Sequence, residues 1–235
     1  MKILFAVALA AVASSTNYQI QVDSLNFGGQ LSSSANYQVN DTLGEIATGE
    51  TAGTAYRLRA GYQNMIVSAI SISAPSDLNL ASINNSSGGQ SSGSVAWTVT
   101  TDNAAGYTLT IKADTNPALQ TGNGSFSNYT PAGSVPDYDW TLDNATLEFG
   151  FSPEGTDVAA RYLDNGSACG TGSGETANRC WDALATTNTT IASRASNNTP
   201  LGTVTTVKFR AEVGTVASAN TGAYNATVTV TALAS

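Results

Sequence analysis

Few residues in this chain could perform catalysis or bind a metal ion, and their types exclude several classes of site. The 235 residues include no histidine and two cysteines. A Ser-His-Asp triad, a Cys-His pair and every histidine-containing metal site are therefore excluded. Glycine-rich stretches are present, but they lack the lysine and the strand-to-helix setting of a phosphate-binding loop.

Four carboxylates in a loop-rich region could still serve a glycosidase: Asp137, Asp139, Glu148 and Glu154. Such an enzyme pairs a general acid with a second carboxylate that acts as nucleophile or base. None of the four lies in a recognisable catalytic motif, and solvated carboxylates that keep an acidic protein soluble explain them more simply. We expect no enzymatic activity and no cofactor.

Oxygen ligands for Ca²⁺ could come from Asp102, Asn103, Asp114, Asp137 and Asp139. The spacing of an EF-hand loop is missing, and turn formation accounts for the same residues without a metal ion. The sequence therefore predicts no metal site.

Aromatic residues offer a different chemistry, the stacking of a sugar ring. Trp97 alternates with the residues of a strand and is predicted to lie in the core. Trp140, Trp181 and Tyr138 fall in a long loop region, where either packing or ligand contact fits. A carbohydrate-binding module that uses these residues is the alternative function, with glycans as partners.

The two cysteines, Cys169 and Cys180, have ten residues between them. An exported chain with an even cysteine count usually pairs them, so we predict a disulfide that closes a polar loop. A redox or metal-binding pair is the weaker alternative, because no histidine or third cysteine can complete a site.

The charge balance disfavours nucleic acid as a partner. The formal net charge is −8, from 17 acidic and 9 basic residues. Neutralising phosphates requires clustered lysine and arginine.

The elements that must position these residues are strands. In Val95–Asp114, apolar and polar residues alternate on both sides of the turn Asp102–Gly106, which predicts an antiparallel hairpin with one wet face. The same alternation returns near the C-terminus. We predict an all-β antiparallel sandwich, immunoglobulin-like or jelly-roll-like, over 69–235. Its predicted core is Trp97, Tyr107, Leu109, Ile111, Val207, Phe209, Val228 and Val230.

A long insertion, 114–200, separates the regular strands of this sandwich. It contains turn-forming clusters, two predicted strands at 140–142 and 145–151, and short helical turns at 157–163 and 180–186. Elaborate loops between regular strands commonly carry the parts of a protein that bind.

The N-terminal residues MKILFAVALAAVASS combine a positive charge, an apolar run and the small-residue pattern Ala11-Val12-Ala13. This pattern is typical of an export signal over 1–13, with Ser14 as the mature start. A buried first strand is the alternative. No later apolar run reaches the ~20 residues of a membrane span.

Residues 14–68 are predicted to form a small β-strand repeat module. Tyr18, Tyr37 and Tyr56 recur at a spacing of 19 within similar sequence words. Chance similarity in a β-rich chain is the alternative. The first word lies in Thr16–Asp23, where Tyr18, Ile20 and Val22 share one face, and this strand could join the edge of a neighbour or pair within its own chain.

The run AWTVTTDNAAGYTLTIKAD and the closing strand TGAYNATVTVTALAS resemble exported bacterial β-sandwich surface proteins, including fimbrial and spore-coat-like subunits with a last strand of the form Gly-x-Tyr-x-x-Thr-Val-Thr-Val. The leading segment resembles uncharacterised secreted proteins with NYQ-type strand repeats. The likeness lies in strand patterns and carries over no site residue. The chain departs from fimbrial subunits because its one possible cystine has a different place.

Together these observations predict a non-enzymatic structural or adhesive protein at the cell surface or outside the cell, with a filament or coat subunit as one form. The expected partners are copies of itself, other surface proteins or glycans. We expect no transmembrane segment apart from the export signal.

Overall fold

The computed structural model divides the chain into two compact units, Met1–Leu9 with Ala69–Ser235 and Ala10–Ser68. We call the first the sandwich unit and the second the N-terminal unit. The structure describes residues 68–84, 87–133 and 135–235, together with the backbone of five strands at 2–7, 31–33, 38–40, 49–52 and 57–60.

The sandwich unit is built almost entirely from strands, which its many β-branched and alternating residues favour. Its elements are β1 (Lys2–Val7), β6 (Ile70–Ile72), β7 (Leu78–Asn79), β8 (Gly89–Thr101), β9 (Tyr107–Ala113), β10 (Leu119–Thr121), β11 (Gly124–Asn128), β12 (Leu147–Glu154), the 3₁₀ helix η1 (Ala160–Tyr162), β13 (Asp182–Ala183), β14 (Thr189–Arg194), β15 (Thr203–Val213) and β16 (Asn225–Ala234).

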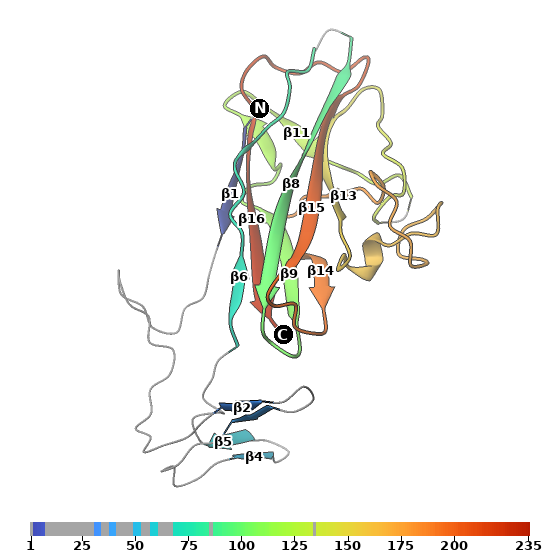
Figure 1. The fold of residues 1–235 in the computed structure, drawn as a ribbon. Coiled ribbons are helices and arrows are strands. Elements are labelled where there is room, and N and C mark those ends of the chain that lie inside the picture. The colour runs from blue at the N-terminus through green and yellow to red at the C-terminus, as the bar shows by residue number, and fades with distance from the viewer. Residues whose placement is uncertain are drawn as a thin grey trace. The chain divides into compact units, whose positions relative to one another are not determined.

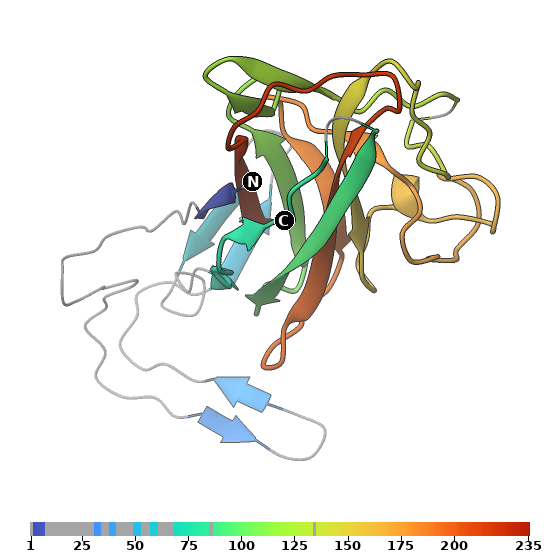
Figure 2. The same ribbon diagram turned by 90° about the horizontal axis from the view of Figure 1, so that it is seen from above.

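These strands form two facing layers (Figures 1 and 2). Pairing follows the order β14-β9-β16-β10-β11-β12-β15-β8-β6, so the short strands β10 and β11 connect one layer, β14-β9-β16, with the other, β12-β15-β8-β6. Among the described strands, β1–β16 and β11–β12 pair in parallel, while the other ladders are antiparallel. The predicted all-β sandwich is confirmed.

The predicted core lies between the two layers. Each of its eight residues is buried, with at most 1% of its surface exposed. The longest ladder, β8 with β15, sets Val207 opposite Val95 and Thr205 opposite Trp97, which fixes the apolar sides of both strands toward the core. Period-2 alternation therefore predicted the buried face correctly.

The predicted hairpin within Val95–Asp114 is wrong. β8 pairs with β6 and β15, whereas β9 pairs with β14 and β16. The turn between them carries the chain from one layer to the other. Gly106 is required there, because its φ is +84° and a Cβ would stand 1.8 Å from the carbonyl oxygen of Arg194.

Two consecutive strands show the same alternation of apolar and polar residues in either of two arrangements. They can pair in one sheet, or they can face each other across the core. The apolar faces of β8 and β9 are both buried in one cluster. The pattern thus predicts which side of each strand is dry and leaves the pairing open.

β1 lies between β16 and β7. It pairs in parallel with β16 over six residues, from Lys2 opposite Asn225 to Val7 opposite Val230, and antiparallel with β7 at Lys2 and Ile3. In this structure, the stretch predicted as an export signal therefore includes a strand that pairs with β16 and β7.

The N-terminal unit contains two antiparallel strand pairs among its described residues. β2 (Leu31–Ser33) pairs with β3 (Gln38–Asn40), and β4 (Gly49–Ala52) pairs with β5 (Arg57–Ala60). β3 and β5 begin directly after Tyr37 and Tyr56, at the predicted spacing of 19. Tyr18, Ile20 and Val22 lie outside the described residues.

The insertion departs from its predicted elements, and it contains three strands that were not predicted, β10, β11 and β14. Residues 140–142 form no strand, and the predicted helical turn at 180–186 contains β13 instead. The strand predicted at 145–151 is β12, and η1 lies within the predicted turn at 157–163. Gly-rich and polar loops carry no period, so only β12, which faces the core, had a clear signal.

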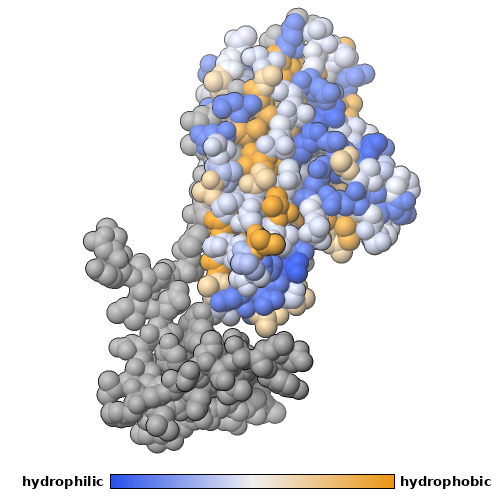
Figure 3. Space-filling view, viewed as in Figure 1, coloured by the Kyte–Doolittle hydropathy of each residue, from blue (hydrophilic) through white to orange (hydrophobic). Residues whose placement is uncertain are grey.

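The surface of the sandwich unit is mixed. Figure 3 shows a narrow band of hydrophobic residues over the strands, while the side of the insertion is mainly hydrophilic. Among the described residues there is no helix with the length and apolar character that crossing a bilayer requires.

Candidate functional site

The insertion meets the outer face of the sheet at Gly150 of β12. A Cβ at this position would lie 2.7 Å from the Cβ of Tyr129, 2.8 Å from the carbonyl oxygen of Asp182 and 3.0 Å from Cζ3 of Trp140. The missing side chain leaves the space in which an aromatic cluster packs directly on the strand.

Trp140 is the centre of this cluster. Its ring stacks on Tyr129 with centroids 4.2 Å apart, and it forms a T-shaped pair with Trp181, with centroids 5.1 Å apart. The guanidinium of Arg210 lies over the Trp140 ring at 4.9 Å and over Trp181 at 6.0 Å. Because Tyr129 occupies one face of the Trp140 ring, Arg210 must lie over the other, in a cation–π contact.

Arg210 and Glu212 are neighbours on the outer face of β15. The Nη2 and Nε atoms of Arg210 donate to Oε2 of Glu212 at 2.5 and 3.0 Å. This ion pair is half-buried and holds the guanidinium in place over Trp140. The role of these two residues was not predicted, since the alternation of a strand does not say which loop covers its outer face.

A groove of about 420 Å³ runs beside this cluster. Its lining includes Trp140, Leu142, Asn144, Arg210 and Glu212, together with residues 213–215 at the end of β15 and residues 87–89 at the start of β8. An amide, a carboxylate and a guanidinium beside an indole are groups that bind sugar hydroxyls. The Nε1 atom of Trp140 is buried and has no hydrogen-bond partner among the described residues, so the polar edge of the indole does not face the groove.

The other two predicted contact residues, Trp181 and Tyr138, do not line the groove. Trp181 is 2% exposed, and its Nε1 donates to the carbonyl oxygen of Asn178 at 3.1 Å. Tyr138 is half-buried beneath the guanidinium of Arg179, 5.0 Å away, and is not part of the groove lining. The structure therefore brings Trp140 to the groove, uses Trp181 as its support and leaves Tyr138 outside.

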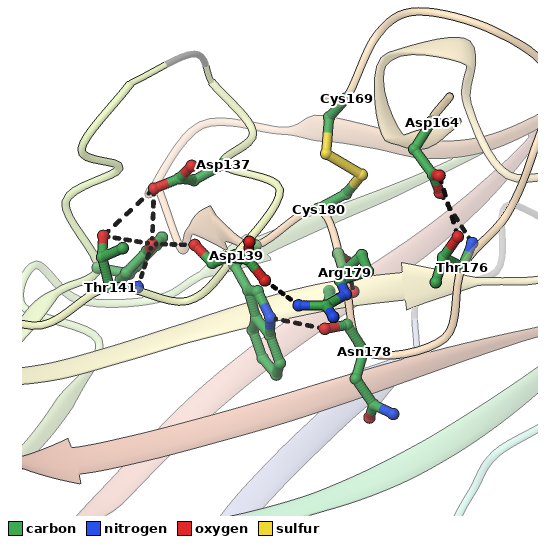
Figure 4. A network of polar contacts seen from close by, with 12 residues as sticks. Asp137, Asp139, Thr141, Asp164, Cys169, Thr176, Asn178, Arg179 and Cys180 are labelled. Carbon is green, nitrogen blue, oxygen red and sulfur yellow. Dashed lines mark hydrogen bonds and ion pairs between the residues drawn. A yellow bond between two sulfur atoms is a disulfide. The ribbon is translucent and has the colours of Figure 1, made fainter. Parts of the chain in front are cut away.

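Asp137 organises the loop that carries Trp140. Its Oδ2 accepts from the Tyr129 hydroxyl at 3.1 Å, the Ala132 amide at 3.0 Å and the Thr141 hydroxyl at 3.3 Å (Figure 4). Its backbone forms a bridge with Trp181. Burial raises the pKa of Tyr129, which keeps this hydroxyl protonated as a donor.

The cystine closes the outermost loop of the insertion. Cys169 and Cys180 are joined in a disulfide with their Cα atoms 5.7 Å apart. Asp164 holds the same loop from inside, because its carboxylate accepts from the Gly166 amide at 2.7 Å and from the amide and hydroxyl of Thr176 at 2.8 and 3.0 Å (Figure 4). Burial alone would raise the pKa of Asp164, but these hydrogen bonds to the charged form lower it overall.

Each of the four carboxylates considered for a glycosidase has a hydrogen-bond or ion-pair partner within the protein. Asp139 pairs with Arg179, and Glu154 accepts from the Asn178 amide at 2.7 Å. Glu148 is buried beneath the loop and accepts from the Thr130 amide at 3.3 Å. Burial raises the pKa of Glu148, the hydrogen bond opposes this, and the nearby charges of Asp143 and Glu212 add to the rise.

Two buried polar clusters were not predicted. The Tyr107 hydroxyl donates to Asp157 at 3.0 Å, and Arg194 pairs with the same carboxylate at 3.2 Å. Asp182 accepts from the Tyr162 hydroxyl at 2.9 Å and from Arg161 at 2.7 Å. Burial is the main cause that raises the pKa of Tyr107 and of Tyr162. In each cluster the carboxylate is at least 20 residues from its partners in the sequence, and no local pattern links them.

Within the described part of the chain, no three Cys, Asp or Glu side chains gather as ligands of a metal ion would. No protein-family model, curated protein or solved structure matches the chain. Function is therefore inferred from the geometry of the insertion and the sheet.

Proposed function

We propose that this chain is a non-enzymatic structural or adhesive protein of the cell surface or the extracellular space, with a filament or coat subunit as its specific form. The supporting observation is that the carboxylates and aromatic rings of the insertion make contacts within the protein itself. Asp137, Asp139 and Glu154 each hold a loop, and the aromatic residues clamp the insertion onto Gly150. Side chains used in this way make a rigid scaffold.

The cystine and the predicted export signal support a location outside the cytoplasm. Disulfides form and persist mainly in oxidising compartments. The resemblance to exported β-sandwich surface proteins points in the same direction.

The test combines location with appearance. Fractionation of cells that express the full chain should find the protein in the envelope or the medium with both cysteines oxidised, and electron micrographs of the purified protein should show filaments or ordered arrays. Retention in the cytoplasm with free thiols would contradict the proposal. So would hydrolysis of a polysaccharide that is lost in both Asp137→Asn and Glu148→Gln.

A second candidate function is glycan binding in the groove beside Trp140. The observation that favours it is the set of polar residues, Asn144, Arg210 and Glu212, that line the groove together with Trp140 and Leu142. Since Tyr129 and Arg210 cover the two faces of Trp140, a sugar would have to displace Arg210 or bind against the edge of the indole.

A glycan array distinguishes this candidate. Binding should be lost in Trp140→Ala and in Asn144→Ala and kept in Tyr138→Ala, whose ring lies outside the groove. Near-UV circular dichroism of each variant checks that the fold is intact. Absence of binding by the folded wild-type protein would leave the scaffold role alone.

A further inference from the structure

A second cavity lies at the end of the sandwich where β8 and β16 begin and β15 ends (Figure 1). Its volume is about 260 Å³. Its lining comes from residues 81–84 before β8, Phe126 of β11, Val213 of β15, and residues 219–222 with Tyr224 before β16. Four segments that are distant in sequence therefore enclose one space.

The buried part of this lining is apolar and aromatic. Phe126, Val213 and Tyr224 are each at most 8% exposed. The rings of Phe126 and Tyr224 meet edge to face, with centroids 5.0 Å apart. Ile83 and Ala219, which are half-buried against the core, add to the apolar wall.

The exposed part of the lining forms a rim that is polar and uncharged. Its members are Ala81, Ser82, Asn84, Asn220, Thr221 and Gly222. Among the described residues that line the cavity, none is acidic or basic. A charged group bound here would lose water without gaining a partner of opposite charge, so the lining favours a neutral ligand.

The rim is held in place by hydrogen bonds within the protein. The hydroxyl of Tyr224 donates to the carbonyl oxygen of Asn220 at 2.9 Å, and the side-chain amide of Asn220 donates to the carbonyl oxygen of Asn123. Gly124 packs closely on both, because a Cβ there would lie 2.9 Å from Nδ2 of Asn220 and 3.2 Å from the Tyr224 hydroxyl. The cavity is therefore formed before any ligand binds, as small-molecule sites usually are.

The volume of the cavity sets the size of the ligand. An engineered apolar cavity of about 150 Å³ binds benzene. The larger cavity at Phe126 therefore accommodates one six-membered ring with a small substituent. A third ring can join the Phe126–Tyr224 pair in the offset-stacked or edge-to-face arrangement that aromatic rings prefer, while the amides and hydroxyls of the rim can bond to a hydroxyl.

We propose that this cavity binds a small neutral phenol, with the ring against Phe126 and Tyr224 and the hydroxyl among the polar residues of the rim. The inference goes beyond the structural role proposed above and does not depend on it. It also differs from the sugar considered for the groove beside Trp140, because both the site and the ligand class are different.

The test uses the full chain and three ring probes observed by fluorine nuclear magnetic resonance: 4-fluorophenol, fluorobenzene and 4-fluorobenzoate. The phenol is neutral at pH 7 and should bind at millimolar concentration. Fluorobenzene lacks the hydroxyl and should bind more weakly. The benzoate is charged and should bind at least about tenfold more weakly than the phenol. Absence of phenol binding, or equal binding of either control probe, would overturn the proposal.

A pair of variants locates the site. Ala219→Phe adds a ring at a position that lines the cavity and should abolish binding of 4-fluorophenol. Ser218→Phe adds the same ring at the adjacent exposed position, outside the lining, and should leave binding unchanged. Near-UV circular dichroism checks that both variants fold. Equal binding of the phenol by the two folded variants would overturn the assignment to this cavity.

A label on the wild-type protein covers the case in which Ala219→Phe does not fold. 4-Azidophenol carries the same ring and hydroxyl, and light attaches it to nearby residues. Mass spectrometry of the digested protein should find the label within 81–84 or 219–224, and excess 4-fluorophenol should reduce it. Labelling that the excess phenol does not reduce, or that is confined to 140–144 beside the other groove, would overturn the proposal.

Discussion

The strands of the sandwich and the insertion at 114–200 belong to one unit but are held in different ways. Along β8, β9, β15 and β16, alternate residues are buried in a shared apolar cluster. Much of the insertion is instead held by a few specific bonds. They include hydrogen bonds to the carboxylates of Asp137 and Asp164 and the disulfide. Burial of apolar area is non-directional, whereas a hydrogen bond depends on one donor and one acceptor.

This difference decides how each region responds to change. A strand can lose an outward side chain at little cost, because its stability comes from the inward row and the backbone ladder. A loop organised around one carboxylate loses several hydrogen bonds when that carboxylate is removed. In the sandwich strands, the cost of a substitution should therefore depend on whether the side chain faces the core. In the insertion, it should depend on whether that particular residue holds the loop.

The largest effect is expected from Leu109→Ala in β9. Leu109 is fully buried, and a large-to-small change in a core costs about 2 to 5 kcal/mol of unfolding free energy. Thr108→Ala, on the half-exposed side of the same strand, should cost little. Urea denaturation measures both, and equal losses would show that the two faces do not differ as described.

The cystine should give the next largest effect. Replacing both Cys169 and Cys180 by alanine should lower the unfolding free energy by about 2 to 3 kcal/mol, since the loop is then free in the unfolded chain. Urea denaturation of the double variant and the oxidised wild type gives the difference. Thiol titration of unfolded, unreduced wild-type protein should find no reactive group, and two reactive thiols would refute the pairing.

Gly150→Ala should disturb the insertion more than the core. The new Cβ meets Tyr129 and a backbone oxygen at under 3.0 Å, and overpacking of this kind costs about 1 to 3 kcal/mol. Tryptophan fluorescence should change as Trp140 is displaced. Gly133→Ala is the matched control in the same insertion, because nothing lies within 4 Å of its Cβ position; a similar loss there would argue against the packing described at Gly150.

The same contrast explains what the sequence could predict. Trp97 and Phe209 stand in alternating runs, so their burial follows from period 2 alone. The partners of β8 and β9 do not follow, because pairing depends on which distant strand closes the sheet. Trp140 was recognised as a candidate, but its contacts with Tyr129, Trp181 and Arg210 join four separate segments, and only the folded chain brings them together.

The smallest effect concerns the pH dependence contributed by Glu148. Its pKa is raised in the folded protein, mainly by burial, so the folded state holds this proton more tightly than the unfolded state. Stability from this group is therefore present at low pH and falls as the pH rises through the raised pKa. Asp164 acts in the opposite sense, because its pKa is lowered and its contribution is lost as the pH falls.

The variant Glu148→Gln isolates the contribution of Glu148 to the pH dependence of stability. The amide oxygen can still accept from Thr130, and the buried charge is gone, so the variant should gain stability relative to the wild type as the pH rises from 4 to 8. Since Asp164 is present in both proteins, its contribution cancels in the difference. Glu175→Gln, at an exposed position of the same insertion, controls for the change in net charge. Urea denaturation across this pH range measures the difference, and a variant that loses stability relative to the wild type with rising pH would show that the Glu148 carboxylate is stabilised where it is buried.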